Sequence, residues 1–332
     1  MKVLFIGGTG IISSACSELA LSRGIDLYLL NRGKSIRPEP EGARILTGDI
    51  RDPASARAAL GDLTFDAVVN WVAFTPQHIQ ADIDLFRGCT DQYIFICSAS
   101  AYQTPPSILP VTESTLLDNP YWEYSRNKIA SEELLVREYR QTKFPFTIVR
   151  PSHTYDKTLL PTEGRYTVID RMRKGKPVIV PGDGTSLWVL THHADFAKGF
   201  VGLLGNARAI GEIFHITSDE WLTWNQIYQT LADAAGVQNP QLVHVASDLI
   251  AAYEPDWGPG LIGDKSNSML FDNSKIKQLV PDFHCTIPFS QGAREIIAWY
   301  DADPFRQIID AKIDAATHRI LEGYARAWPK KA

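Results

Sequence analysis

Cysteine is scarce in this sequence, and long apolar runs are missing from it. The four cysteines form no Cys-x-x-Cys pair and have no metal-ligand spacing with histidine: Cys16, Cys89, Cys97 and Cys285. Neither a disulfide framework nor a metal site is therefore predicted. No stretch approaches the roughly 20 apolar residues that a membrane span requires. The first apolar run, residues 3–6, is too short for the core of a signal peptide. We expect a cytoplasmic protein with no membrane partner.

A basic excess is also lacking. The chain has 33 Lys and Arg residues against 38 Asp and Glu residues, which gives a formal net charge of −5. Proteins that bind nucleic acids generally carry the opposite imbalance, so no nucleic-acid partner is expected. At 45% hydrophobic and 21% charged residues, the composition is that of an ordinary globular protein with a buried core.

The first 150 residues alternate short β-branched runs with amphipathic stretches. Strands are predicted at 3–6, 26–30, 44–46, 67–71, 93–96 and 146–149, and helices at 11–23, 53–60, 79–87 and 121–141. This alternation predicts an α/β fold with a parallel, doubly wound sheet of the Rossmann type. We therefore assign residues 1–150 to an NAD(P)-binding Rossmann domain.

After Pro151 the pattern loosens, and proline and glycine become frequent. Helices are expected at 166–174, 194–204, 223–235 and 288–300, and strands at 177–180, 188–191 and 212–216. These residues, 151–332, are assigned to a smaller substrate-binding lobe that is interleaved with the first domain. Apolar residues recur at helical spacing from Asp303 to Arg326. We expect packing contacts from them: Phe305, Ile308, Ile309, Ile313, Ile320 and Leu321.

A glycine-rich segment separates the first predicted strand from the first predicted helix. It runs Gly7-Gly8-Thr9-Gly10-Ile11-Ile12-Ser13. Glycines allow a tight turn and close approach of a pyrophosphate, and the helix N-terminus offers free N–H groups. The position between strand and helix supports a dinucleotide site. Its expected ligands are Gly7, Thr9, Gly10, Ile11 and Ile12.

The end of the second strand indicates which dinucleotide is preferred. NAD sites usually have an acidic residue here, whereas this chain has Asn31, followed by Arg32 and Lys34. Because these side chains suit a 2′-phosphate, NADP is favoured, with NAD possible. Asp49 follows the third strand and is placed to accept a hydrogen bond from an adenine amino group. The expected cofactor set also includes Ile50, Val72, Ala73 and Pro151.

A candidate reaction centre follows from a Tyr-x-x-x-Lys string. Tyr124 and Lys128 lie at i and i+4, on one face of a predicted helix. A nearby ammonium is expected to lower the tyrosine pKa from about 10 toward neutrality, which makes the phenol a general acid/base. Ser98, at the end of the fifth strand, is positioned to hydrogen-bond the reacting oxygen.

Taken together, these motifs resemble the extended short-chain dehydrogenase/reductase superfamily, and within it the NAD-dependent epimerase/dehydratase family. The likeness extends to Arg150-Pro151, Asp195 and the segment from Gly263 to Leu279. The resemblance implies that Ser98 orients the substrate, Tyr124 exchanges its proton, and Lys128 holds the nicotinamide ribose. It also implies a homodimer that pairs the helices at 79–87 and 121–141.

The sequence departs from that family at the substrate side. Ala99 and Ser100 stand where 4,6-dehydratases have an Asp-Glu pair, so no dehydration is expected. Trp188 and Leu261 occupy the places of two arginines that hold a diphosphate in the family. Histidine replaces a frequent asparagine at position 153. The substrate residues predicted from these comparisons are Phe74, Ser100, Tyr102, His153 and Trp188.

The leading interpretation is an NAD(P)-dependent epimerase or reductase that acts on a carbinol or ketone of a sugar-like small molecule. Three alternatives stay open. One is an RNA-binding protein, since the glycine loop and the turn after Asn31 also resemble the chloroplast stem-loop-binding proteins. Another is a nucleotide-sugar 4-epimerase with atypical phosphate ligands. The third is a cofactor-sensing regulator, against which the presence of Ser98, Tyr124 and Lys128 argues.

Overall fold

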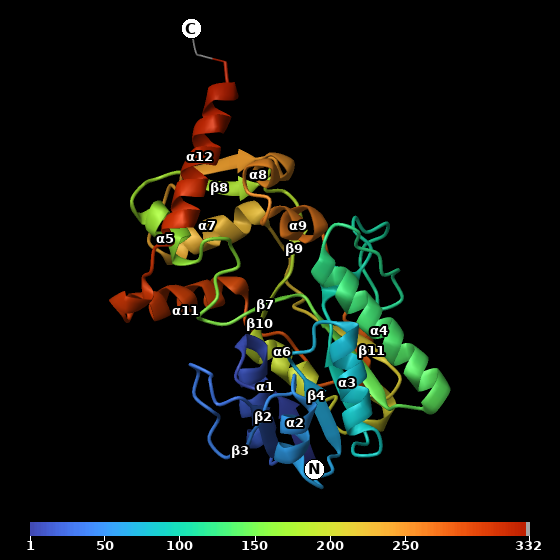
Figure 1. The fold of residues 1–332 in the computed structure, drawn as a ribbon. Helices are drawn as coiled ribbons and strands as arrows, with labels where there is room; N and C mark the ends of the chain where they lie inside the picture. The colour runs from blue at the N-terminus through green and yellow to red at the C-terminus, as the bar shows by residue number, and fades with distance from the viewer. Residues whose placement is uncertain (330–332) are drawn as a thin grey trace.

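A seven-stranded parallel sheet forms the centre of the protein, whose computed structural model describes residues 1–329 (Figure 1). Its order is β11-β6-β5-β4-β1-β2-β3. The bounds of these strands are β1 Lys2–Ile6, β2 Asp26–Asn31, β3 Arg44–Thr47, β4 Ala67–Asn70, β5 Tyr93–Ile96, β6 Phe146–Pro151 and β11 Ile213–Ile216. The predicted Rossmann fold is confirmed.

The chain winds outward from β1 in both directions. β1 pairs with β2 on one side, in the register Lys2 with Asp26, and with β4 on the other, in the register Val3 with Ala67. The strand order therefore reverses between β1 and β4. In open parallel sheets, the crevice beyond the carboxyl ends of the strands at this point is the usual ligand site.

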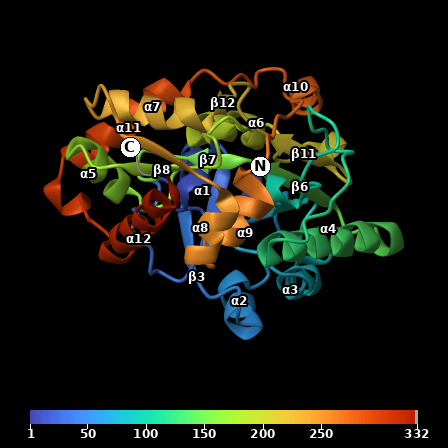
Figure 2. The ribbon, with the colours of Figure 1, turned by 90° about the horizontal axis from the view of Figure 1, so that it is seen from above.

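Helices cover both faces of the sheet (Figures 1 and 2). α1 (Ile11–Ser22) packs against α6 (His193–Val201) on one face, and α3 (Pro76–Phe86) packs beside α4 (Glu123–Thr142) on the other. α2 (Pro53–Leu60) lies on the α3 face, where its Leu60 joins the same apolar cluster. Each face therefore has its own core, because both sides of every central strand are apolar.

The boundary assigned at residue 150 does not separate the Rossmann sheet and its helices from the rest of the fold. β11 and α6 both follow Pro151, yet β11 pairs with β6 in the main sheet and α6 covers α1. The interleaving of the two domains extends into the sheet itself, and the strand expected at 212–216 belongs to the Rossmann layer.

The remaining chain forms a smaller lobe above the carboxyl ends of the strands (Figure 1). Its helices are α5 Tyr166–Arg173, α7 Trp224–Ala234, α8 Ser247–Tyr253, α9 Gly258–Gly260, α11 Phe289–Asp301 and α12 Ala311–Ala327. Three short strand pairs accompany them: β7 (His153–Tyr155) with β10 (Leu190–His192), β9 (Leu187–Trp188) with β12 (Leu222–Thr223), and β8 (Val178–Pro181) with β13 (Leu242–Val245). A π-helical turn, η3, spans Leu261–Lys265. α10 (Ser274–Leu279) packs instead against β11 and joins the core on the α1 and α6 side of the sheet.

The tail corrects one prediction. Phe305, Ile308 and Ile309 are 91%, 72% and 44% exposed, so the expectation that they are packing residues was wrong. The helical spacing is interrupted because Pro304 begins a separate short turn. A new helix, α12, then starts behind Asp310, whose carboxylate accepts the N–H groups of the next turn.

Within residues 1–329, no helix combines the length and the apolar character that crossing a membrane requires.

Candidate active site

The first loop of the sheet is shaped for a phosphate group. Gly7 and Gly8 have φ values of +98° and +110°, a region that other residues rarely adopt. A Cβ at Gly8 would lie 2.6 Å from Cδ2 of Leu29, so a side chain there would collide with β2. The hydroxyl of Ser17 donates to the Gly8 carbonyl at 2.9 Å and fixes the turn. The loop therefore fits a dinucleotide that approaches the N-terminus of α1.

Two adjoining cavities run along the carboxyl edge of the sheet, and they share Gly7, Thr9, Ser35, Val72 and Phe74. The outer cavity lies over β2 and β3 and contains many of the predicted cofactor residues: Thr9, Asn31, Arg32, Lys34, Asp49, Ile50 and Val72. The inner cavity lies over β1 and β5 and contains most of the others: Gly7, Gly10, Ile11, Ile12, Lys128 and Pro151. Ala73 is buried behind them.

Charged side chains surround the outer cavity. The Arg32 guanidinium lies 4.0 Å from the Asp49 carboxylate, and both groups are partly exposed. The side-chain oxygen of Asn31 accepts the N–H of Gly33 at 2.8 Å, which shapes the turn after β2. Arg51, which the sequence analysis did not select, also lines this cavity and donates to the Val72 carbonyl.

Lys128 is held in the inner cavity by backbone groups. Its ammonium donates to the carbonyl oxygens of Ala73 and Ile96, each at 2.7 Å. It lies 5.6 Å from the centre of the Tyr124 ring. Burial lowers the pKa of Lys128 to about 8. The ammonium thus sits at a fixed point beside the tyrosine, with its alkyl stem enclosed.

The predicted lowering of the Tyr124 pKa was wrong for the protein without its cofactor. Burial raises this pKa to about 12, the nearby Cys97 and Asp264 raise it further, and only a hydrogen bond with Ser98 opposes the shift. The ammonium of Lys128 is turned toward carbonyl oxygens rather than toward the phenol oxygen, which explains why it does not offset desolvation.

A third cavity, the reaction cavity, opens beyond Tyr124 between the sheet and the smaller lobe. Tyr124 and Pro151 line both this cavity and the inner one. The reaction cavity brings together residues that the sequence separates by as much as 167 positions: Ser98, Ser100, Trp122, Tyr124, His153, Trp188, Asp264 and Lys265. The Ser98 and Ser100 hydroxyls lie 2.9 Å apart, and Ser125 donates to Ser100 at 2.9 Å.

Two polar atoms of the reaction cavity have no hydrogen-bond partner among residues 1–329. They are Nε2 of His153 and Nε1 of Trp188, and both are buried. Burial lowers the pKa of His153 to about 3, so its imidazole is neutral. Buried polar groups are normally paired, and these two point to a ligand that supplies the missing contacts.

Two of the predicted substrate residues lie elsewhere. Tyr102 lines no described cavity, because its ring is fully buried under Arg150 and its hydroxyl bonds Nδ1 of His215 at 3.0 Å. Phe74 lines the two cofactor cavities instead of the reaction cavity. His192 and His193 have partners, the Glu295 carboxylate and the Ile11 carbonyl, as expected for structural histidines.

A buried network fixes the segment that carries Val72, Ala73 and Phe74. The Asp82 carboxylate on α3 accepts from the Asn70 amide and from the Tyr93 hydroxyl, each at 2.5 Å. The Asn70 oxygen in turn accepts the N–H of Val72 at 2.8 Å. Sequence patterns did not reveal this network, because its members come from β4, α3 and β5.

Asp264 is another residue that sequence reasoning missed. It lies in η3, and burial raises its pKa to about 6. The available signal was the resemblance of the segment that starts at Gly263 to the corresponding segment of the epimerase/dehydratase family. Nothing in the sequence placed the carboxylate in the cavity of Tyr124.

The parallel sheet, its glycine-rich first loop and the cleft above it place the chain among the Rossmann-fold proteins. More specifically, a model of the NAD dependent epimerase/dehydratase family matches residues 3–217, which is well over half of the chain. The protein belongs to this family.

Curated relatives include proteins of different activity. The chain is 28% identical over 258 residues to the chloroplast stem-loop binding protein of 41 kDa b from Arabidopsis thaliana, covering 73% of this chain and 65% of that protein. It is 26% identical over 244 residues to the 2'-dehydrokanamycin reductase of Streptomyces kanamyceticus, covering 71% of this chain and 67% of that enzyme. The chain thus spans about two thirds of the length of these relatives.

Solved structures share the fold over nearly the whole length. The epimerase Mth375 from Methanothermobacter thermautotrophicus superposes with a TM-score of 0.74 at 17% identity, over 92% of this chain and 94% of that one. The UDP-glucose 4-epimerase of Bifidobacterium longum, in complex with NAD+ and UDP, gives a TM-score of 0.72 at 18% identity, over 92% and 99% of the two chains.

Proposed function

We propose that this protein is an NAD(P)-dependent oxidoreductase or epimerase that moves a hydride at a carbinol or ketone carbon of a sugar-like small molecule. The observation that carries the proposal is the position of Tyr124, which lines both the inner cavity and the reaction cavity, with Ser98 and Lys128 beside it. A group with this placement touches both a cofactor and a substrate.

Each residue has a proposed role that follows from its position. The bound nicotinamide would supply or accept the hydride. Tyr124 holds the proton that the substrate oxygen gains or loses, and Ser98 donates a hydrogen bond to the same oxygen. The positive charge of Lys128 would stabilise the phenolate form of Tyr124. A bound ribose would accept hydrogen bonds from this ammonium in place of the Ala73 and Ile96 carbonyls.

NADP is the cofactor we favour. Arg32, Lys34 and Arg51 line the outer cavity together with one carboxylate, that of Asp49. This excess of positive charge suits a 2′-phosphate, and the carboxylate that would accept hydrogen bonds from free ribose hydroxyls is absent at Asn31.

The substrate we favour is not a nucleotide diphosphate. Arg171 and Arg173, the arginines of the smaller lobe that could replace the missing phosphate ligands, form ion pairs with Asp314 and Asp301. Lys265 is then the cation left near the reaction cavity. We expect UDP, dTDP, GDP and CDP to bind in the millimolar range, about −4 kcal/mol. Calorimetry measures this directly, and micromolar affinity for any of the four would contradict it.

Substitution of the tyrosine tests the catalytic assignment. Tyr124→Phe should keep NADPH binding and lower turnover by a factor of about 10² to 10⁴, the usual contribution of general acid/base catalysis. Turnover is followed by NADPH absorbance, with a panel of sugar-derived ketones and alcohols to find a substrate. Tyr121→Phe is the matched control, because Tyr121 is exposed and outside the reaction cavity. Wild-type turnover in Tyr124→Phe would refute the assignment.

RNA binding, which the name of the Arabidopsis relative indicates for that protein, is not what we propose here. The net charge of −5 gives no general attraction for phosphate backbones, and such attraction supplies most of the non-specific affinity for RNA.

A further inference from the structure

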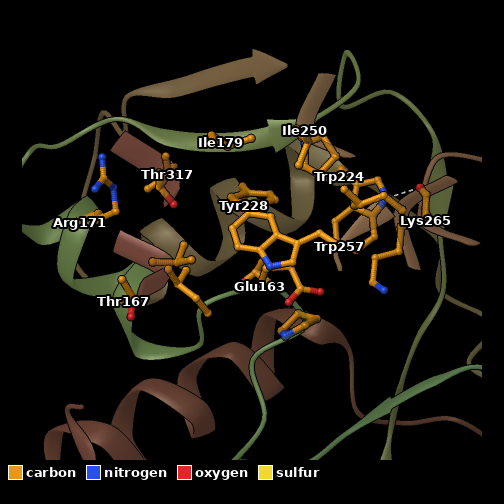
Figure 3. A pocket seen from close by; sticks show the side chains of 17 residues that line it. Glu163, Thr167, Arg171, Ile179, Trp224, Tyr228, Ile250, Trp257, Lys265 and Thr317 are labelled. Atoms are coloured by element: carbon orange, nitrogen blue, oxygen red, sulfur yellow. Dashed lines mark hydrogen bonds between the residues drawn. The ribbon is translucent and has the colours of Figure 1, made fainter. Parts of the chain in front are cut away.

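A fourth cavity, here called the lobe cavity, lies within the smaller lobe (Figure 3). The space between its walls is about 630 Å³ including open solvent, and residues of α5, β8, α7, α8, η3 and α12 line it. Three aromatic side chains, Trp224, Tyr228 and Trp257, and the aliphatic Ile179 and Ile250 form its walls. The lobe cavity separates two apolar clusters of the core, which together supply these residues.

The π-helical turn η3 separates the lobe cavity from the reaction cavity. Leu261 lines the lobe cavity, Asp264 lines the reaction cavity, and Lys265 lines both. The indole N–H of Trp224 donates to the Lys265 carbonyl at 3.0 Å, which ties the turn to α7 (Figure 3). Lys265 is therefore the residue that the two cavities have in common.

The polar groups of the lobe cavity do not suit an anion. Arg171 is already bonded to the Asp314 carboxylate and to the Pro177 carbonyl. Glu163 is exposed at the edge of the cavity, where its carboxylate repels negative charge. Leu261 presents an apolar side chain where the family resemblance expects an arginine. Of the two cations that line the cavity, Arg171 is already paired, so an entering diphosphate would find Lys265 alone without an ion-pair partner among residues 1–329.

One polar atom of the lobe cavity is unsatisfied. The hydroxyl oxygen of Thr162 is buried and has no hydrogen-bond partner among residues 1–329. Aromatic walls with a single unpaired hydroxyl match a flat or alicyclic ring that carries one hydrogen-bonding group. Such sites, largely apolar with a few placed polar groups, are typical for uncharged small molecules.

We infer that the lobe cavity binds the uncharged, ring-containing end of the substrate, while the carbinol or ketone of the same molecule lies at Tyr124. This inference rests on the proposed function and narrows it: the substrate is a sugar-like group attached to an apolar ring, such as a glycoside, and not a nucleotide sugar. Trp257 and Trp224 contact the ring, and Thr162 bonds its polar substituent.

Binding of matched glycosides tests the inference without turnover. The probes are 2-naphthyl β-D-glucopyranoside, methyl β-D-glucopyranoside and UDP-glucose, titrated into the Tyr124→Phe protein with NADPH present. The naphthyl glycoside should bind roughly tenfold or more tightly than the methyl glycoside, because only its ring is buried against the aromatic walls. UDP-glucose should bind no better than the methyl glycoside.

A pair of tryptophan variants locates the ring. Trp257→Ala should remove the advantage of the naphthyl group, whereas Trp221→Ala, at an exposed tryptophan outside the lobe cavity, should keep it. Should Trp257→Ala fail to fold, indole N–H resonances of the unsubstituted chain give the same answer. Those of Trp224 and Trp257 should shift on addition of the naphthyl glycoside, and that of Trp221 should not.

Three results would overturn the inference: equal affinity for the two glycosides, an unchanged naphthyl advantage in Trp257→Ala, or tighter binding of UDP-glucose. Each is measured in a protein that lacks the catalytic tyrosine, so each stands apart from the turnover test. Conversely, wild-type turnover in Tyr124→Phe would refute the proposed catalytic role of Tyr124. The measured glycoside affinities would not be affected by that result.

Discussion

Burial controls the protonation of the groups around Tyr124 more strongly than charge does. Desolvation raises the pKa of Tyr124 to about 12 and lowers that of Lys128 to about 8, so both groups are pushed toward their neutral forms. From the sequence, only the spacing of the pair was visible, and spacing gives proximity without orientation. The direction in which the Lys128 ammonium points depends on the Ala73 and Ile96 carbonyls, which no local pattern reveals.

Asp82 is a buried acid whose ionisation costs stability. Burial raises its pKa to about 6, against about 3.9 in an unfolded chain. Between these values the folded state binds more protons than the unfolded state, so the free energy of unfolding falls as pH rises from about 4 to about 6. Asp82→Asn keeps an oxygen that accepts from Asn70 and Tyr93. We expect this fall to be smaller by about 2 kcal/mol in the variant.

Urea unfolding of both proteins across this pH range measures the difference. Asp84→Asn provides the control, because Asp84 is an exposed acid on the same helix. An unchanged pH dependence in Asp82→Asn would show that the carboxylate is already ionised in the folded protein at pH 4.

At the scale of elements, the best predictions came from local signals. Helix 53–60 was predicted with its observed bounds, because proline at position 53 is typical of a first helical turn. The structure adds Asp52 as the residue that caps this helix. The first six strands were also predicted within a residue or two of their bounds. In the tail the prediction was confirmed for Ile320, which is buried, and was wrong for Phe305, Ile308 and Ile309, because periodicity alone does not show that Pro304 and Asp310 divide the tail into two elements.

The residues of the candidate site likewise fall into those that local sequence signals predicted and those that they did not. Residues next to a strand end, such as Gly7 and Ser98, were found because the fold class fixes where strand ends meet. Asp264 and Lys265 were not assigned to the site, because their approach to Tyr124 depends on how the smaller lobe packs over the sheet. That packing rests on apolar contacts spread over many elements, for which the sequence has no short signature.

The segment between β2 and β3 determines the cofactor preference that we expect. Arg32 is the exposed cation nearest to Asn31, and its weak pairing with Asp49 leaves it free to reach a phosphate. We expect tighter binding of NADPH than of NADH, and a roughly tenfold loss of NADPH affinity in Arg32→Ala. NADH affinity should stay the same. Fluorescence titration of both cofactors measures this, with Arg57→Ala on α2 as a charge-matched control.

Equal affinities for the two cofactors in the unsubstituted protein, or an equal loss for both in Arg32→Ala, would refute this preference. In the first case the cations of the outer cavity would merely face solvent.

At the scale of the whole molecule, α3 and α4 form a continuous outer face on one side of the sheet (Figures 1 and 2). Arg87, at the end of α3, donates to Glu138 of α4 at 2.9 Å and holds the two helices together. The exposed charged side chains are Asp84 on α3 and, on α4, both acids and bases: Glu123, Arg126, Glu133, Arg137 and Arg140. A two-fold axis that brings Asp84 of one copy beside Arg137 of the other would place opposite charges together.

We accordingly expect a homodimer that buries α3 and α4 in a four-helix interface. Light scattering at micromolar concentration should give twice the chain mass. Arg137→Glu places an acid opposite Asp84 and should shift the equilibrium toward monomer, since like charges that face each other across an interface are costly. Arg23→Glu makes the same charge change at the exposed end of α1 and should leave the dimer intact. A monomer in the unsubstituted protein would exclude the interface. A dimer that both variants preserve would count against α3 and α4 as the contact face.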